Sequence, residues 1–233
     1  MEAAPRNLKI LTGITIGLFV LALYMVFIYA PREAVMGDVQ RVFYFHVASG
    51  WVGAVAFLVT AIAGGVYLAK RDRKWDRVAV ASVEIGVVFT FINIASGSIW
   101  ARPIWNTWWT WDPRLVTATI MLLLYVAYLM LRQGIDDPDR RARFGSVYGI
   151  VAFVSVPITF VSIRIFRTIH PVIIGSGDPA AEGAFDMTPR MLQAFMFSLL
   201  TFTFIYATLL WYRIRLGRLS EEVEERKMEM MSV

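Results

Sequence analysis

The sequence predicts an all-α, polytopic membrane protein with six transmembrane helices. Of its 233 residues, 58% are hydrophobic and 18% are charged, and the mean hydropathy is +0.58, which lies outside the usual soluble range. Six apolar segments are long enough, or nearly so, to cross about 30 Å of hydrocarbon at about 1.5 Å per helical residue. They lack alternation of period two, and an open sheet cannot satisfy its backbone in lipid, so a helical bundle is favoured over a barrel.

The six predicted helices follow one another in a single membrane domain. They cover residues 10–30, 42–69, 78–99, 115–131, 144–163 and 191–212. The first segment follows Arg6 and Lys9, as the core of a signal peptide would. Its 21 uncharged residues are long for such a core, however, and no small-x-small cleavage site precedes Pro31. We therefore expect this segment to stay as a membrane anchor.

Helix-end signals mark the later elements. Asp112 suits an N-cap and Pro113 suits the first helical position, so together they predict the start of the fourth helix. The stretch "TPRM", Thr188 to Met191, predicts the start of the sixth helix in the same way. The tail "SEEVEERKMEMM" indicates a short, solvated extension of that helix.

The basic residues predict the orientation. Sixteen of the 23 Lys and Arg residues lie in the N-terminal segment, the second and fourth loops and the C-terminal segment, and seven lie on the opposite side. The positive-inside rule then places both termini in the cytoplasm. Segments 31–41, 100–114 and 164–190 face outward. Because the net charge of +5 is distributed by loop, it argues for a lipid bilayer partner and against nucleic acid.

The third loop contains an unusual density of tryptophan. The stretch "WNTWWTWDPR" holds four of the eight tryptophans, and the crowded set comprises Trp100, Trp105, Trp108, Trp109 and Trp111. The spacing of Trp105, Trp108 and Trp109 predicts three indoles on one face of a helix that lies along the membrane. Two interpretations remain open for the cluster, an interfacial aromatic belt and a platform for a flat ligand.

Two histidines lie on the same predicted side as the tryptophans. His46 is at the outer end of the second helix and His170 is in the fifth loop, and the sequence contains no other histidine. The absence of cysteine excludes thiolate zinc sites, iron–sulfur clusters and cysteine nucleophiles. Two imidazoles are too few for a tetrahedral zinc site, but they match the two axial positions of a haem iron. The alternative is that each histidine is simply a polar residue tolerated at the interface.

Haem also suits the charges of the outer side. Its two carboxylates need cations, and this side has seven arginines and no lysine. The arginine fork matches a carboxylate better than the lysine ammonium does. The candidates are Arg41, Arg102, Arg114, Arg164 and Arg167. For some of them, contact with lipid phosphates is an equally good explanation. No Gly-rich phosphate loop, HExxH or GxSxG occurs, which argues against ATP hydrolysis and common hydrolase chemistry.

The stretch "SGSIWARPIWNTWWTWDPRLV", Ser96 to Val116, resembles the WWD signature of the haem-handling proteins of cytochrome c biogenesis. The chain length, the six helices and one histidine on each side of the signature resemble the haem exporter protein C family of the cytochrome c maturation system. "YFHVASGW" and "VPITFVSIRIFRTIHP" look like the two histidine regions of that family. Family members usually carry glycine where this sequence has Asn106, a residue that also tolerates left-handed backbone.

This resemblance implies a function. His46 and His170 would be axial ligands of haem b carried as cargo, and the tryptophan segment with Asp112 would hold the porphyrin. The implied partners are a haem chaperone, ABC transporter subunits and a small membrane subunit, and the implied location is a bacterial or archaeal cytoplasmic membrane. We expect a delivery component more than a catalyst. The alternatives are a cytochrome c haem lyase or synthase of the same superfamily, a bis-histidine b-type electron-transfer subunit, and a permease without haem.

Overall fold

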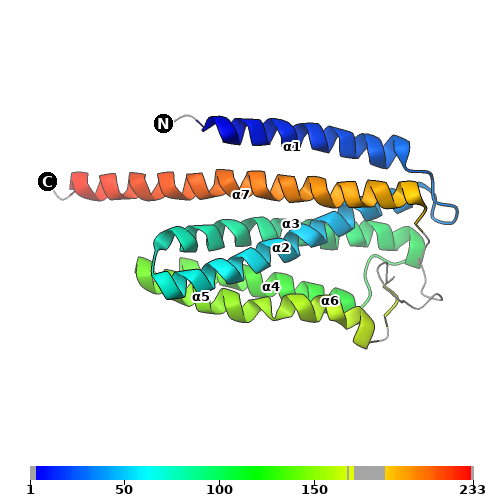
Figure 1. The fold of residues 1–233 in the computed structure, drawn as a ribbon. Coiled ribbons are helices and arrows are strands. Elements are labelled where there is room, and N and C mark those ends of the chain that lie inside the picture. Colours follow the sequence, from blue (N-terminus) through cyan, green and yellow to red (C-terminus); the bar gives the residue numbers. More distant parts are fainter. Residues whose placement is uncertain (1–3, 167, 171–186, 232–233) are drawn as a thin grey trace.

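The computed structural model describes residues 4–166, 168–170 and 187–231, and long helices dominate it (Figure 1). Within these ranges, six helices or continuous helix pairs are long and apolar enough to cross a membrane. The predicted fold class is therefore confirmed. The helical elements are α1 (Arg6–Tyr24), the π-helical turn η1 (Met25–Tyr29), the 3-10 turn η2 (Asp38–Gln40), α2 (Arg41–Lys70), α3 (Arg73–Trp105), α4 (Pro113–Gln133), α5 (Pro138–Phe153), α6 (Ser155–Ile165) and α7 (Pro189–Met231).

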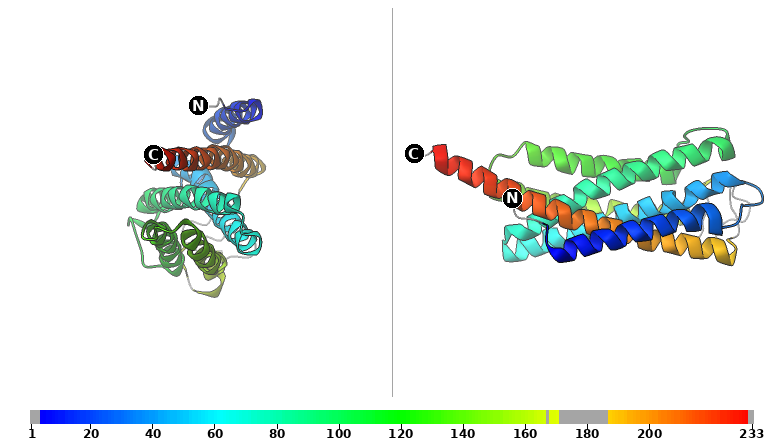
Figure 2. Two further views of the ribbon diagram at one scale, coloured as in Figure 1. Left: turned by 90° about the vertical axis from the view of Figure 1, so that its left-hand side faces the viewer. Right: turned by 90° about the horizontal axis from the view of Figure 1, so that it is seen from above.

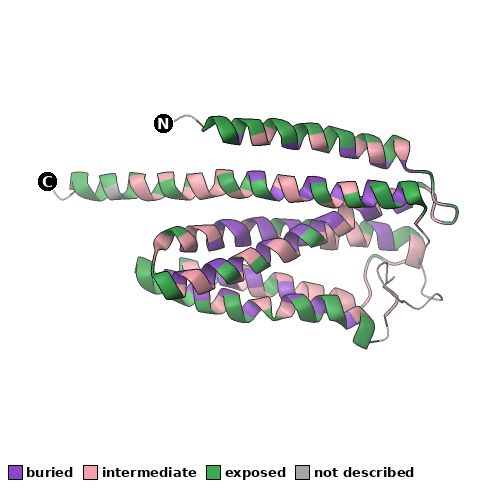
Figure 3. Ribbon diagram, in the orientation of Figure 1, coloured by how far each residue is buried: buried purple, intermediate pink, exposed green. Residues whose placement is uncertain are grey.

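The helices form a bundle around the closely packed pair α2 and α3. Helix α7 lies against this pair, and α1 packs along α7 at the edge of the bundle, while α4, α5 and α6 lie on the other side (Figures 1 and 2). Burial is greatest on α2 and α3, and α1 is exposed along most of its length (Figure 3). Because the exposed residues of α1 are mainly apolar, this helix suits a lipid environment.

The two ends of the bundle differ. Both termini lie at one end, which we call the terminal end. At the opposite end α2 begins, α3 ends and α4 begins; we call it the histidine end because His46 lies there. Helix α7 runs beyond the rest of the bundle at the terminal end, as the extension predicted from the charged tail requires (Figure 1).

Two ion pairs, one of them nearly buried, connect the helices near the terminal end. The guanidinium of Arg132 on α4 donates to both carboxylate oxygens of Asp76 on α3, over 2.7 and 2.8 Å. Both side chains are nearly buried. Arg213 on α7 forms an ion pair with Glu84 on α3. Charges inside a bundle are costly unless they are paired, so these contacts hold α4 and α7 at fixed positions against α3.

The fifth membrane segment is divided into two helices. Helix α5 ends at Phe153 and α6 begins at Ser155. The break has a local cause in Pro157, which has no backbone N–H to donate to the carbonyl of Phe153 and whose ring would clash with that carbonyl. Helix α6 precedes the described residues 168–170, which include His170.

Candidate functional site

A pocket opens at the histidine end between α2, α3 and α4. About 530 Å³ of space outside protein atoms lies in this pocket and its mouth, where the pocket is open to solvent. Its walls include both histidines, three tryptophans and one arginine. The lining residues are His46, Asn93, Ile94, Gly97, Ser98, Trp100, Ala101, Trp105, Trp109, Arg114, Leu115, Ala118 and His170.

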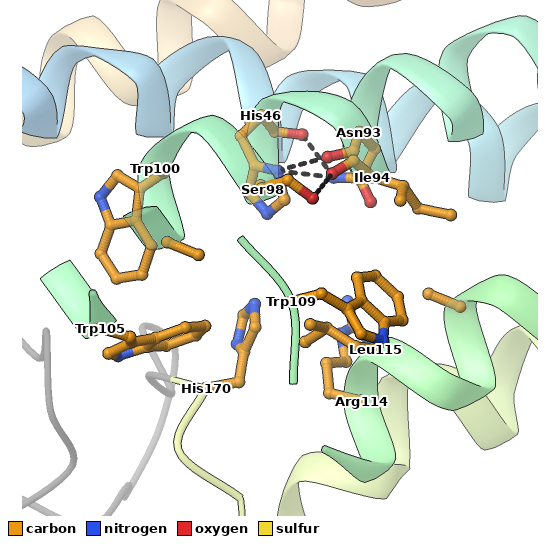
Figure 4. A pocket seen from close by; sticks show the side chains of 13 residues that line it. His46, Asn93, Ile94, Ser98, Trp100, Trp105, Trp109, Arg114, Leu115 and His170 are labelled. Atoms are coloured by element: carbon orange, nitrogen blue, oxygen red, sulfur yellow. Dashed lines mark hydrogen bonds between the residues drawn. The ribbon is translucent and has the colours of Figure 1, made fainter. Parts of the chain in front are cut away.

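The two histidines face each other across this pocket. Their rings point toward one another, with 6.4 Å between ring centroids and 38° between ring planes (Figure 4). His46 comes from the first turns of α2, and His170 comes from a non-helical segment between α6 and α7. The fold therefore brings together two side chains that are 124 positions apart in the sequence.

Helix α3 holds the ring of His46. The Nδ1 atom lies 2.9 Å from the backbone oxygen of Asn93 and 3.3 Å from the hydroxyl of Ser96. The Asn93 amide nitrogen is also 3.2 Å from Nδ1, but the carbonyl contact is shorter and a carbonyl oxygen only accepts. A neutral His46 that donates from Nδ1 to this carbonyl leaves the Nε2 lone pair for a metal. The Asn93 amide also donates to the backbone oxygen of His46 over 2.7 Å.

Glycine and helical spacing explain how this contact is possible. A Cβ atom on Gly97 would lie 2.9 Å from Cε1 of His46, so only glycine leaves room for the ring at its present position. Asn93 and Ser96 were not predicted from the sequence as partners of His46. A signal was present, because Asn93, Ser96 and Gly97 are spaced three and four residues apart and so share one face of a helix.

The tryptophans divide into two groups. Trp100, Trp105 and Trp109 line the pocket, and the rings of Trp100 and Trp105 meet edge to face at 5.2 Å. Trp108 and Trp111 do not line it, and they are 59% and 83% exposed. An apolar aromatic wall and an exposed aromatic edge therefore lie side by side at the histidine end.

The predicted helical stack of Trp105, Trp108 and Trp109 is wrong. Helix α3 ends at Trp105 because Asn106 adopts the left-handed conformation, with φ 54° and ψ 22°. The guanidinium of Arg102 donates to the backbone oxygen of Asn106 over 2.7 Å, which satisfies a carbonyl at the helix end. The left-handed backbone at Asn106 agrees with the expectation that asparagine tolerates this conformation.

Asp112 forms the predicted N-cap of α4. Its carboxylate accepts a hydrogen bond from the backbone N–H of Arg114 over 2.9 Å, and Pro113 occupies the first helical position. The same carboxylate also accepts from the hydroxyl of Thr168 and from the backbone N–H of Ile169. Asp112 does not line the pocket, but it touches the segment that leads to His170.

Among the predicted arginines whose side chains the structure describes, Arg114 alone lines the pocket. Its guanidinium donates to the backbone oxygen of Thr159 on α6 and lies over the Phe160 ring, 4.8 Å from the ring centroid. These contacts fix the stem of the arginine between α4 and α6. The pocket thus has one well-positioned cation in its wall.

Three of the other predicted arginines do not line the pocket. Arg41 pairs with Asp38 over 3.1 Å and donates to the backbone oxygen of Val26, which joins the start of α2 to η1. Arg102 is exposed and bound to the end of α3, and Arg164 is exposed near the end of α6. Arg167 is outside the described residues.

Comparison with known proteins assigns the family. The family model "Heme exporter protein C" matches residues 1–229. The chain belongs to the haem exporter protein C family. A protein of that name from Bradyrhizobium diazoefficiens is 31% identical over 205 residues, which cover 87% of this chain and 77% of the relative. Its namesake from Escherichia coli strain K12 is 30% identical over 187 residues, covering 80% and 74%.

A more distant relative is eukaryotic. The "putative cytochrome c biosynthesis ccmC-like mitochondrial protein" of Marchantia polymorpha is 26% identical over 165 residues, which cover 71% of this chain and 70% of the relative. Membership of the haem exporter protein C family, together with six apolar helices, makes this chain a multi-pass, haem-handling membrane component of cytochrome c maturation. The resemblance stated from the WWD segment is thereby confirmed.

The donor set of the pocket fits a haem iron better than a bare metal ion. Among the described residues, no group of three or more His, Asp or Glu side chains is placed to hold a metal. Two facing imidazoles suit a metal whose other four positions are already filled, as they are by a porphyrin. Aromatic walls suit the faces and edges of such a ring.

Proposed function

We propose that this member of the haem exporter protein C family binds haem b as cargo at the histidine end and presents it to a haem chaperone on the outer side of the cytoplasmic membrane. In this proposal His46 and His170 are the axial ligands, and Trp100, Trp105 and Trp109 cover the porphyrin. The facing pair of imidazoles is the observation that supports the proposal most.

The distance between the rings agrees with a shared iron. If each imidazole binds through a bond of about 2.0–2.1 Å and its nitrogen lies about 1.1 Å from the ring centre, two opposed axial rings have centres about 6.2–6.4 Å apart. The rings of His46 and His170 are 6.4 Å apart. A preference of histidine for the membrane interface would not by itself set the distance between the two rings.

The chain's own residues bind and orient the cargo. Arg114 is the first candidate for a haem carboxylate, because its guanidinium is in the pocket wall. Arg41, Arg102, Arg164 and Arg167 remain proposed partners of the carboxylates at the rim. Haem supplies the vinyl group for covalent attachment to the chaperone, and no residue of this chain needs to change covalently.

Partners complete the proposal. The family resemblance implies assembly with ABC transporter subunits and a small membrane subunit. Trp108 and Trp111 are exposed beside the pocket, and exposed aromatic residues are common anchors in protein interfaces. We propose that these two tryptophans contact the haem chaperone when it is bound and the lipid headgroups when it is absent.

The visible spectrum of the detergent-purified protein tests the ligands directly. We expect a Soret band and the spectrum of low-spin, bis-histidine haem. His46→Ala and His170→Ala each remove one of only two histidines, so each should lose haem or change the spectrum. Added imidazole should restore the six-coordinate spectrum in both variants. Haem content and spectra that match the wild type in both variants would overturn the ligand assignment.

A transfer assay separates presentation from the alternatives. The haem-loaded protein is mixed with purified haem chaperone, and haem is expected to leave the membrane protein for the chaperone. Rapid redox cycling with quinol and no transfer to any acceptor would instead support an electron-transfer subunit. Attachment of haem to an apocytochrome by this chain alone would support a lyase.

A further inference from the structure

We propose that Asp112 is a positioning residue that fastens His170 in the pocket, in addition to capping α4. This inference rests on the proposed function, because it concerns the geometry of the second axial ligand. It assigns a physical role to the acidic residue at the end of the tryptophan-rich segment.

The carboxylate of Asp112 joins the start of α4 to the segment that carries His170. One oxygen accepts from the N–H of Arg114 over 2.9 Å and from the hydroxyl of Thr168 over 2.7 Å. The other oxygen accepts from the N–H of Ile169 over 3.0 Å. With its side chain largely buried, Asp112 is shielded from competing water.

Thr168 extends this contact to the histidine. A carboxylate only accepts, so the Thr168 hydroxyl must donate its proton to Asp112. Its lone pairs are then directed elsewhere, and one of them accepts from the backbone N–H of His170 over 3.0 Å. The order Asp112, Thr168, His170 is therefore a directed chain of hydrogen bonds that ends at the candidate ligand.

The two histidines are held in different ways. His46 is part of helix α2 and its ring is bonded to α3, so its position follows from the packing of two long helices. His170 lies on a segment without regular secondary structure. Such a segment loses backbone entropy when it is ordered, and fixed side-chain contacts offset that loss. Asp112 supplies two such contacts within two residues of His170.

Capping alone does not explain an aspartate here. Serine, asparagine and aspartate cap helices about equally well, because one acceptor is enough. The bonds to Thr168 and Ile169 use further acceptor sites, spread over both oxygens, which only a carboxylate offers. Substitutions that keep the cap and remove the other bonds can therefore separate the two roles.

The decisive variants are Asp112→Ser and Asp112→Asn in the full-length, haem-loaded protein. Serine keeps the cap but is too short to reach Thr168 and Ile169. Asparagine keeps one acceptor oxygen but loses the second oxygen, which accepts from the N–H of Ile169. A hydrogen bond to a charged group changes an equilibrium by about 10- to 100-fold. We expect haem to dissociate at least about tenfold faster from Asp112→Ser. The spectrum should become that of His170→Ala, and added imidazole should restore it.

Asp137 provides a matched control. It caps α5 in the same Asp-Pro arrangement, with Pro138 at the first helical position, and its carboxylate accepts from the N–H of Arg140 over 2.7 Å. Asp137→Ser should leave haem content and spectrum unchanged. Equal effects of Asp112→Ser and Asp137→Ser would show that changing the capping residue of an Asp-Pro helix start is sufficient, and the positioning role would be overturned.

A measurement without haem keeps this inference separate from the proposed function. In the apo protein, hydrogen–deuterium exchange at the Ile169 amide should be at least about tenfold faster in Asp112→Ser than in the wild type. Unchanged exchange overturns the fastening role even if haem binding is intact. If the wild type binds no haem but Ile169 is protected by Asp112, the contact is real and the proposed function fails alone.

Discussion

The position of the His46 ring depends on a missing side chain at Gly97. A methyl group there would lie 2.9 Å from Cε1 and 3.2 Å from Nδ1 of the ring. Gly97→Ala should therefore turn the imidazole away from α3 and misdirect its Nε2 atom. We expect a large loss of bound haem with little loss of stability, because alanine also favours the helix by about 0.4–1 kcal/mol. Haem per protein and the thermal midpoint of the same samples measure the two effects.

Gly65 on α2 is the control for this substitution. A Cβ atom at that position meets nothing within 4 Å, so Gly65→Ala should leave haem binding intact. Normal haem content in Gly97→Ala would mean that the His46 ring has more freedom than its packing indicates.

The tryptophans offer a second test at this scale. Trp109 lines the pocket, whereas Trp111 is 83% exposed and does not. An aromatic contact adds about 0.5–1.5 kcal/mol beyond buried area, so Trp109→Leu should raise the apparent dissociation constant for haem by about 2- to 10-fold. Trp111→Leu should leave it unchanged. Titration of the apo proteins with haem measures both dissociation constants. An equal effect of the two substitutions would support the interpretation of the tryptophan cluster as an interfacial aromatic belt.

Single residues were predictable where their chemistry is rare. The two histidines stood out because the chain has no others, and Asp112 stood out because Asp-Pro is a strong helix-start signal. The arginines were harder to assign, since a guanidinium binds carbonyl oxygens as readily as a carboxylate of the cargo. Arg41 illustrates this, because it bonds to Val26 and Asp38 at the start of α2.

At the scale of elements, the Asp76–Arg132 pair holds α3 and α4 together. Removing one partner of a buried pair leaves an unpaired charge and costs about 3–5 kcal/mol. Asp76→Ala should therefore lower the free energy of unfolding in detergent by about that amount. The exposed pair Arg73–Asp139 is the control, and Arg73→Ala should cost no more than about 1 kcal/mol. Similar losses in the two variants would contradict a special role for the buried pair.

Some helix ends could be predicted from the sequence and others could not. The starts of α4 and α7 were predicted from Asp112-Pro113 and Thr188-Pro189, because capping is a local property of a few residues. The end of α3 was not predicted, because the spacing of the tryptophans favoured a helix through Trp109. In the structure the left-handed backbone of Asn106 ends the helix at Trp105. The hydropathy pattern likewise predicted one helix over residues 144–163. In the structure this segment is divided near Pro157 into α5 and α6.

At the scale of the whole molecule, hydropathy predicted six spans because each must cross the bilayer independently of its neighbours. It carries no information on which helices touch. The central position of α2 and α3 and the peripheral position of α1 come from packing between distant segments. The convergence of His46 and His170 at one end was predictable all the same. Four membrane spans separate the first loop from the fifth, and an even number of crossings brings both loops to the same face of the membrane.

Orientation in the membrane is the property on which outward presentation of haem depends. The distribution of Lys and Arg predicts both termini in the cytoplasm, which would put the histidine end outside. The chain has no cysteine, so a single introduced cysteine reports one position without background. Val35, between η1 and η2, and Met228, in the last turns of α7, are 91% and 67% exposed and lie away from the pocket.

A membrane-impermeant maleimide should label Val35→Cys in intact cells and Met228→Cys only after the cells are permeabilised. The expectation follows from the charges, because each Lys or Arg resists transfer across the membrane during insertion. Both variants must retain the wild-type haem spectrum, since neither position contributes to the pocket. The reverse labelling pattern would put the two histidines on the cytoplasmic side, and an external haem chaperone could then not receive haem from this pocket.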